Sequence, residues 1–477
     1  MSKAEGNKAF PWRLLGLPAV LILVFLWGVS DQPFFWDSLL QGSKWAHWYL
    51  DNDFASLLLP EALDAGHPPF FAVYLALVWK CFGKSLAISH WALLPILLGI
   101  LWQLYRLIRY FLPTKHWAWA LLLLLTDATL IGHSSLVSPD ILLCFGFLLA
   151  LNGWLHRRPW QLTAGALCFG LVSIRGLFAL AAIGGIILVG EYLRGQRNWL
   201  HQALQLLLAL LPAALLLLAY YSYHYAQTGW WLSTPNAAWS EHRSWIGLSG
   251  LVRNIAVLGW RLLDFGHIAS WLLLLLSSYQ LWRRRQGLEQ NTRLLLTIPL
   301  ITLLAYAPAL ILISNPIGHR YLLPLYLSIT LLATHLLAHA FGRSKLLPYL
   351  VSAAVLLQLS GHFWIYPAHI AQGWDASLAY LPYGELRSEM ITYIDEQGIP
   401  PEEVGTVFPN IGPMNFIDLS GRQEGFVGKD LERQRWIFYA NVFNDFTDEE
   451  LQELQSNWRE AKRLERRGIC VILYEKK

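Results

Sequence analysis

Chemistry on this chain could begin at Asp37, a carboxylate that directly follows the first long apolar stretch. Phe35 and Trp36 precede it, in a loop over residues 31–66 that is rich in aromatic and acidic residues. A carboxylate at the level where lipid headgroups meet water is partly desolvated, which raises its pKa and suits a general base. A solvated loop acid would give the same pattern, so Asp37 is a candidate catalytic residue weighed against that alternative.

Further polar groups stand where apolar segments begin or end: His67, Asp140, Arg175, His319, Arg320 and Tyr321. An arginine can bind a phosphate through two parallel hydrogen bonds, so Arg175 and Arg320 are candidates for holding an anionic substrate. Structural interpretations compete, because prolines and acids favour helix starts and arginines extend to lipid headgroups. No Walker loop, GxGxxG, HExxH or Ser-His-Asp spacing is present, and the histidines show no metal-ligand pattern.

The elements that must position these groups are membrane helices. Of the 477 residues, 55% are hydrophobic and only 14% are charged, and the mean hydropathy is +0.39. A soluble domain carries about 25% charged residues, which argues against a single soluble globule. The 24 tryptophans suit membrane–water interfaces. The net charge of +4 comes from basic residues beside apolar stretches, which favours a membrane over a nucleic-acid partner.

Eleven stretches have the length and apolar character of membrane spans. They are 12–30, 86–108, 117–133, 139–155, 160–175, 177–193, 199–222, 262–282, 294–313, 321–341 and 346–366. The first is interpreted as a retained span, since its apolar run lacks a small-residue cleavage site. The shorter stretch 68–82 is expected to lie along the membrane interface rather than to cross it.

Lysine and arginine concentrate in cytoplasmic loops, and this rule orients the spans. If 68–82 does not cross, the basic residues gather on one side, at the N-terminus (Lys3, Lys8) and around 109–116, 156–159, 194–198, 283–293 and 342–345. Ten of the thirteen acidic residues before position 367 then fall on the other, outer side: Asp31, Asp37, Asp51, Asp53, Glu61, Asp64, Asp127, Asp140, Glu241 and Asp264. Any chemistry is therefore expected on the outer face.

The chain changes character near Pro367. Residues 367–477 carry 12 Lys and Arg against 19 Asp and Glu, whereas the first 366 residues are basic. Helices are predicted over Glu385–Gln397 and Asp448–Arg467, the second from its many i,i+4 charge pairs. Strands are predicted over Val404–Phe408, Trp436–Val442 and Cys470–Tyr474. The orientation above places this small α/β domain outside the cytoplasm.

In their order, these motifs resemble the membrane-embedded glycosyltransferases of the GT-C type. The closest group is the protein O-mannosyltransferase and aminoarabinose-transferase superfamily, and the resemblance covers roughly residues 10–340. It implies that Asp37 is the catalytic carboxylate, although Ser38 follows where the family usually has a glutamate. It also implies that Asp140 is the acid of the second outer loop.

The resemblance assigns the basic motifs to substrate binding. His67 stands before Pro-Pro where the family has a lysine, and it can replace that contact with phosphate if it is protonated. Arg175-Gly176 matches the Lys-Gly of the family and keeps its charge. Arg320-Tyr321 matches the Arg-Tyr motif, and His319 directly precedes this pair.

We therefore expect an all-α polytopic membrane protein of about eleven transmembrane helices plus interfacial helices, with a GT-C-like domain over 1–366 and an α/β extracytoplasmic domain over 367–477. Its expected activity is inverting sugar transfer from a polyprenyl-phosphate-linked donor to a hydroxyl or phosphate acceptor on protein, lipid A or a surface glycan. No nucleic acid is expected as a partner, and a divalent metal is left open. The expected location is a bacterial inner membrane, with the active site and the C-terminal domain in the periplasm.

A transporter or lipid flippase is the main alternative. Transporters tend to have internal repeats and polar groups near the middle of the membrane, and this sequence shows neither. A membrane scaffold that presents the acidic tail is a third interpretation. A scaffold would not explain why aspartates and arginines gather at one face of the membrane.

Overall fold

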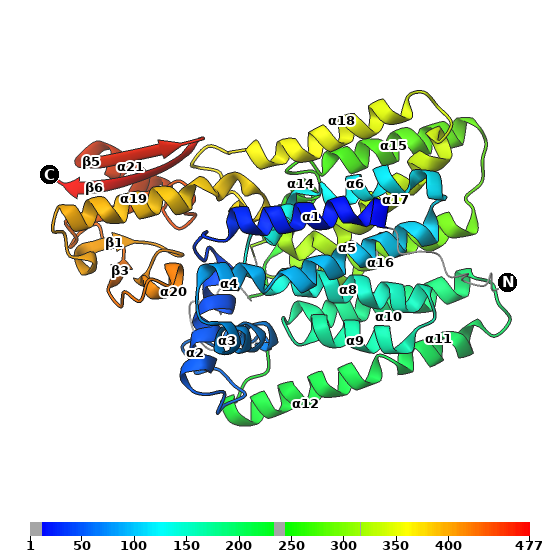
Figure 1. The fold of residues 1–477 in the computed structure, drawn as a ribbon, viewed down its shortest axis with the longest axis horizontal. Helices are drawn as coiled ribbons and strands as arrows, with labels where there is room; N and C mark the ends of the chain where they lie inside the picture. Colours follow the sequence, from blue (N-terminus) through cyan, green and yellow to red (C-terminus); the bar gives the residue numbers. More distant parts are fainter. Residues whose placement is uncertain (1–11, 233–243, 315) are drawn as a thin grey trace.

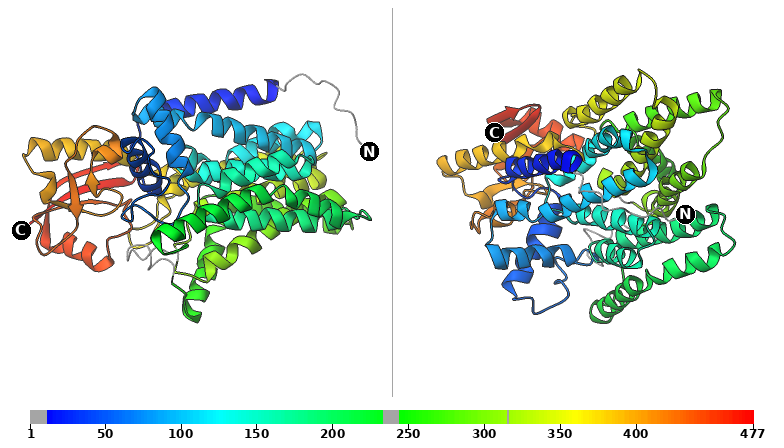
Figure 2. Two further views of the ribbon diagram at one scale, coloured as in Figure 1. Left: turned by 90° about the horizontal axis from the view of Figure 1, so that it is seen from below. Right: turned by 45° about the vertical axis from the view of Figure 1, so that its right-hand side comes forward.

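The computed structural model describes residues 12–232, 244–314 and 316–477. A bundle of helices makes up most of the molecule, and a small domain with a β-sheet lies at one end of it (Figure 1). Figure 2 shows the same arrangement from two further sides. Lys3, Lys8 and Glu241, which entered the charge argument, lie outside the described residues.

The helices of the bundle follow the apolar stretches of the sequence. They are α1 (Trp12–Val29), α2 (Trp45–Asp51), α3 (Phe70–Phe82), α4 (Leu86–Trp91), α5 (Leu94–Phe111), α6 (Trp117–Leu125), α7 (Ala128–Ser134), α8 (Pro139–Leu155), α9 (Pro159–Gly170), α10 (Arg175–Leu193), α11 (Trp199–Leu208), α12 (Leu211–Thr228), α14 (Leu248–Arg261), α15 (Ile268–Arg283), α16 (Gln290–Ile311), α17 (Leu323–Phe341) and α18 (Leu347–Ser360). Short helical turns η1 (Ser38–Lys44), η4 (His319–Leu322), η6 (Trp374–Ala376) and η7 (Leu378–Tyr380) lie between or after them.

The expected count of eleven spans is not confirmed. Among the described residues, five helices are long and apolar enough to cross a membrane, or seven if each of two bent pairs counts as one span. One of these pairs is α6 and α7, which meet at 63°. Others fall short in length: α9 has 12 residues and α3 has 13, whereas a span needs about 20 residues at 1.5 Å per residue.

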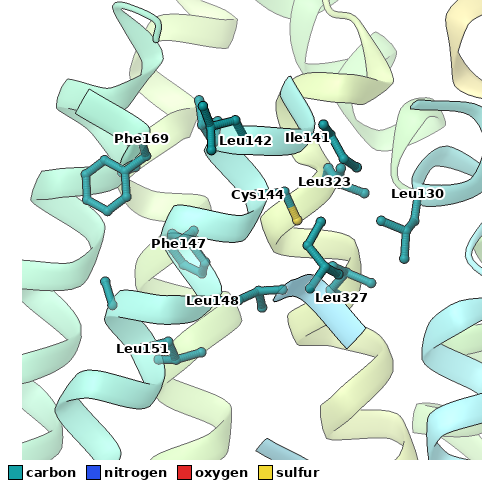
Figure 3. Close-up of a cluster of buried hydrophobic side chains, with 14 of the residues drawn as sticks. Leu130, Ile141, Leu142, Cys144, Phe147, Leu148, Leu151, Phe169, Leu323 and Leu327 are labelled. Carbon is teal, nitrogen blue, oxygen red and sulfur yellow. The ribbon is translucent and has the colours of Figure 1, made fainter. Parts of the chain in front are cut away.

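The helix α8 shows why hydropathy alone overcounts lipid-facing spans. It is apolar on all sides and almost wholly buried, as expected of a helix surrounded by other helices. Gly146 on α8 and Gly165 on α9 allow this close packing, because a Cβ at Gly146 would lie 2.7 Å from the Gly165 carbonyl oxygen. Figure 3 shows part of this core, with α8 side chains beside Phe169 of α9 and Leu323 and Leu327 of α17.

The C-terminal domain contains a six-stranded sheet in the order β2-β3-β1-β4-β6-β5. Its elements are α19 (Pro382–Glu396), β1 (Val404–Thr406), β2 (Gly412–Pro413), α20 (Asn415–Asp418), β3 (Gly425–Gly428), β4 (Trp436–Ala440), α21 (Asp448–Asn457), β5 (Trp458–Arg466) and β6 (Ile469–Lys476). β1 runs parallel to β3 and β4, and β6 runs antiparallel to β4 and β5. The small α/β domain is thus confirmed as a sheet with helices.

The helix predicted over Asp448–Arg467 is wrong in its second half. It ends at Asn457, and Trp458–Arg466 forms strand β5 on the edge of the sheet. Arg467 and Gly468 both have positive φ, at 52° and 81°, which suits a two-residue hairpin turn into β6. The charges that suggested i,i+4 helix pairs instead cover an exposed edge strand, where charged side chains discourage pairing with other chains.

Candidate functional site

The predicted site residues come from segments that are far apart in the sequence and end at the same place. Asp37 directly precedes η1, Asp140 lies in the first turn of α8, and Arg175 is the first residue of α10. Arg320 and Tyr321 lie in η4, directly before α17. These helix starts meet at the end of the bundle that faces the C-terminal domain.

Arg320 is the centre of the cluster. Its Nη2 forms an ion pair with Oδ2 of Asp37 at 2.7 Å, and its Nε lies 3.9 Å from Oδ2 of Asp140. Its Nη1 donates to the carboxylate of Asp375. One guanidinium therefore touches three carboxylates from three separate segments.

Arg175 supplies the second positive charge. It forms an ion pair with Asp140 through Nη1, and its Nε donates to Ser173 Oγ at 3.1 Å. The ring of Tyr321 lies beside both arginines, with its centroid 4.5 Å from the Cζ of Arg175 and 5.0 Å from that of Arg320. The two guanidinium groups thus share one aromatic ring, an arrangement that favours cations.

Asp37 differs from the other carboxylates in its exposure. Its side chain is 23% exposed, against 2% for Asp140 and 7% for Asp375. These three carboxylates face two guanidinium groups. The cluster therefore carries one excess negative charge when the nearby His133 side chain is neutral. Burial, assisted by the charges of Asp140 and Asp375, raises the pKa of Asp37 above its ordinary value despite the opposing effect of Arg320. A carboxylate of raised pKa that is open to a ligand has the properties of a general base.

The backbone before Asp37 is strained. Trp36 has φ 51°, a left-handed conformation that is rare for a bulky residue and costs on the order of 1–3 kcal/mol. The rings of Phe35 and Tyr380 stack in parallel with centroids 4.5 Å apart, and the Trp36 ring packs against Phe408 at 5.7 Å. Contacts with the C-terminal part of the chain therefore hold the turn that presents Asp37.

His67 lies beside the cluster rather than in it. Its Nδ1 accepts a hydrogen bond from the backbone N–H of Ile174 at 3.1 Å. This contact fixes the backbone directly before Arg175. Its expected contact with a substrate phosphate remains a prediction.

His319 points away from Arg320, although the two residues are adjacent. Its ring contacts Oδ2 of Asp264 at 3.0 Å through Nε2. The same carboxylate accepts hydrogen bonds from Arg261 at 3.2 Å and from the hydroxyl of Tyr366. Asp264 therefore links His319 to Tyr366 in the segment after α18, and the role of His319 in substrate binding remains a prediction.

Two residues of the cluster escaped the sequence analysis, His133 and Asp375. Nε2 of His133 lies 3.9 Å from Oδ2 of Asp375, and both side chains are buried. His133 had no recognisable motif around it. Asp375 did carry a signal, because it is the only Asp, Glu, Lys or Arg between Lys345 and Glu385. The predicted domain boundary at residues 366 and 367 places Asp375 in the C-terminal domain, and that boundary remains a prediction.

Within the described ranges, no group of three or more His, Cys, Asp or Glu side chains is arranged to hold a metal ion. The three carboxylates of the cluster each have an arginine as their nearest charged partner. This donor set fits an arginine-centred site better than a metal centre.

With this geometry in place, the chain can be compared with known proteins. No protein-family profile matches the sequence, and no curated protein matches it. Among solved structures, it is similar to two crystal structures of ArnT from Cupriavidus metallidurans, one bound to undecaprenyl phosphate and one in the apo state. The bound form has a TM-score of 0.54 at 13% identity over 97% of this chain and 98% of that one. The apo form has 0.55 at 14%, over 96% and 97%.

The chain has the GT-C fold. This confirms the fold class that the motif order predicted, and with it an integral membrane protein. The oligosaccharyltransferase of Archaeoglobus fulgidus, in a complex with Zn and sulfate, overlaps less well. Its TM-score is 0.45 at 14% identity, over 80% of this chain and 55% of that one.

Proposed function

We propose that this protein transfers a sugar from a polyprenyl-phosphate-linked donor to an acceptor on the outer face of a membrane. The observation that carries the proposal is the contact between Arg320 and Asp37, 2.7 Å apart, in a cluster that also holds Arg175. A partly exposed carboxylate and two guanidinium groups thus lie within one site. The match to an ArnT structure bound to undecaprenyl phosphate supports a donor of this kind.

In the proposed reaction, Asp37 accepts the proton of the acceptor hydroxyl as the hydroxyl oxygen attacks the anomeric carbon. The bond between that carbon and the phosphate oxygen breaks, and the phosphate leaves with the electron pair. Arg320 and Arg175 stabilise the negative charge that develops on the leaving phosphate. A single displacement of this kind inverts the configuration at the anomeric carbon.

The remaining assignments follow from the same geometry. Asp140 holds Arg175 and lies close to Arg320, so it orients both cations rather than taking the acceptor proton. The acceptor is a hydroxyl or phosphate on protein, lipid A or a surface glycan. We place the site on the periplasmic side of a bacterial inner membrane. In support, the basic residues Arg157 and Arg194 follow the C-terminal ends of α8 and α10, whereas Asp140 and Arg175 lie at the N-terminal ends of the same helices.

A turnover assay tests this proposal. Full-length protein in nanodiscs is given a panel of radiolabelled polyprenyl-phosphate sugars with candidate acceptors, and release of polyprenyl phosphate is measured. We expect Asp37→Asn to lower turnover by about 10²–10⁴-fold, the usual contribution of a general base. Asp53→Asn is the matched control, since Asp53 lies in the same outer loop, is 83% exposed and pairs with Lys80. Equal turnover by Asp37→Asn and wild type would refute the role of Asp37, and movement of intact lipid without transfer would favour a flippase.

A further inference from the structure

The segment between α18 and α19 crosses the end of the helix bundle and brings Asp375 to the site. Asp375 lies in η6, and its carboxylate binds Nη1 of Arg320 while Nη2 of the same guanidinium binds Asp37. Nε2 of His133 in α7 lies 3.9 Å from the same oxygen of Asp375, Oδ2. Arg320 is thus held between two carboxylates, one partly exposed and one buried.

The bundle fixes this segment closely. The backbone of Ser377 passes so near to Gly132 of α7 that a Cβ at Gly132 would lie 2.8 Å from the Ser377 nitrogen. The hydroxyl of Tyr380 lies 2.9 Å from Ser135 Oγ, and its ring stacks on Phe35. These contacts directly after η6 therefore leave Asp375 little freedom to follow Arg320 if the guanidinium moves.

The C-terminal domain holds the same segment. Asn444 donates to the carbonyl oxygen of Gln372 at 3.0 Å, and the Gln372 side chain bonds the backbone of Trp364 and Tyr366. The hydroxyl of Tyr366 reaches Asp264. Asp375 is therefore anchored both to the sheet domain and to the helices.

We infer that Asp375 is a positioning residue for Arg320: it holds one arm of the guanidinium so that the other arm faces Asp37 and the leaving group. This inference rests on the proposed transfer reaction. Without Asp375, the guanidinium is free to turn fully onto Asp37 or to leave the site. Either movement weakens the reaction, since a base paired with a full positive charge accepts a proton less readily and a displaced arginine no longer meets the phosphate.

The charge of Asp375 gives the inference a signature that a purely structural role would lack. Four charged groups face Asp37: Arg320 of η4, Asp140 of α8, Asp375 of η6 and Arg175 of α10. The negative charge of Asp375 is one of the causes that raise the pKa of Asp37. Its removal should therefore move the acidic limb of the pH–rate profile to lower pH.

The experiment compares Asp375→Asn and Asp375→Glu with wild type, as full-length protein in nanodiscs. We expect Asp375→Asn to lower kcat by about 100-fold, the order of loss when a positioned group shifts by about 1 Å. Its acidic limb should lie at lower pH, and Asp375→Glu should recover the wild-type limb and part of the rate. Asp395→Asn is the control, because that carboxylate is 43% exposed, pairs with Arg422 on the sheet domain and should change neither quantity.

A cryo-EM structure of Asp375→Asn separates this inference from the proposed function. We expect the Arg320 guanidinium to be displaced from its wild-type position, whether or not the wild-type protein turns over any donor tested. An unchanged Arg320 or an unchanged acidic limb overturns the positioning role. Absence of transfer by wild type counts against the proposed function alone. If Asp375→Asn does not fold, Asp375→Glu decides, because a longer carboxylate must shift Arg320 if it positions that side chain. A displaced Arg320 with a lower kcat supports the role, and an unmoved Arg320 with the wild-type kcat overturns it.

Discussion

Two clusters of buried charge lie at opposite ends of α10 and are built from the same kinds of residue. At the C-terminal end, the carboxylate of Glu191 is fully buried and lies 2.5 Å from Nη2 of Arg157 and 3.7 Å from Nε of Arg194. The indole of Trp154 donates to it at 2.8 Å. At the N-terminal end, Arg175 belongs to the cluster around Arg320.

The two clusters differ in charge balance and in access. Around Glu191, two arginines meet one carboxylate, and both carboxylate oxygens have hydrogen-bond donors. Around Arg320, three carboxylates meet two arginines, and Asp37 is partly exposed. Buried ion pairs occur in structural and functional roles alike, so burial alone does not identify a site. The excess of like charge and the partly exposed member favour the cluster of Arg320 as the site of the proposed reaction.

Of the three tests that compare these clusters, replacing Arg320 with Gln should have the largest effect. The substitution removes the cation that faces the leaving phosphate, and loss of one such electrostatic contact costs on the order of 10²–10³ in kcat. It also leaves Asp37 and Asp375 without their shared partner, so the melting temperature should fall as well. Steady-state turnover and thermal unfolding in the same nanodiscs measure the two effects. Loss of stability with normal turnover per folded molecule would make this cluster structural, like that of Glu191.

Replacing Glu191 with Gln is the converse test. Two arginines would then lack their buried carboxylate, and breaking a buried pair in this way costs about 3–5 kcal/mol of folding free energy. Turnover per folded molecule should stay within about twofold of wild type. Glu191 lies at the other end of α10, and the effects of changes at distant sites are usually independent. The measurement is unfolding by denaturant, paired with turnover normalised to folded protein. A large loss of turnover without destabilisation would contradict the distinction between the clusters.

Sequence reasoning found only part of the cluster around Arg320. The positions of the residues explain which members it found and which it missed. Asp37 follows an apolar stretch, and Asp140, Arg175 and Arg320 lie where later ones begin, so the topology brings all four to one end of the bundle. Asp375 was missed because its segment has no periodic pattern and joins the site through tertiary packing alone.

The fold shows the same division. The apolar stretches located the helices, but not how many of them cross a membrane, because a helix such as α8 is apolar for its protein neighbours. Similarly, the charges of Trp458–Arg466 fit a helix or an edge strand, and only pairing with β6 decides. Features that depend on one segment alone were therefore predictable. Features that depend on packing or pairing with another segment were not.

The smallest expected effect is a pH dependence in which activity and stability change in opposite directions as Asp37 ionises. Because its pKa in the folded protein is raised above the value of about 3.9 in an unfolded chain, the folded state binds more protons between those two values. Stability should therefore fall as pH rises through this window, while turnover should rise, because the base must be ionised. The test measures thermal unfolding and turnover in pH steps upward from about 4, which is close to the pKa of an aspartate in an unfolded chain. It checks that stability falls and that turnover rises. In Asp37→Asn, stability should no longer fall with rising pH through the contribution of this side chain. An unaltered pH dependence of stability would mean that the ionised Asp37 does not destabilise the folded protein.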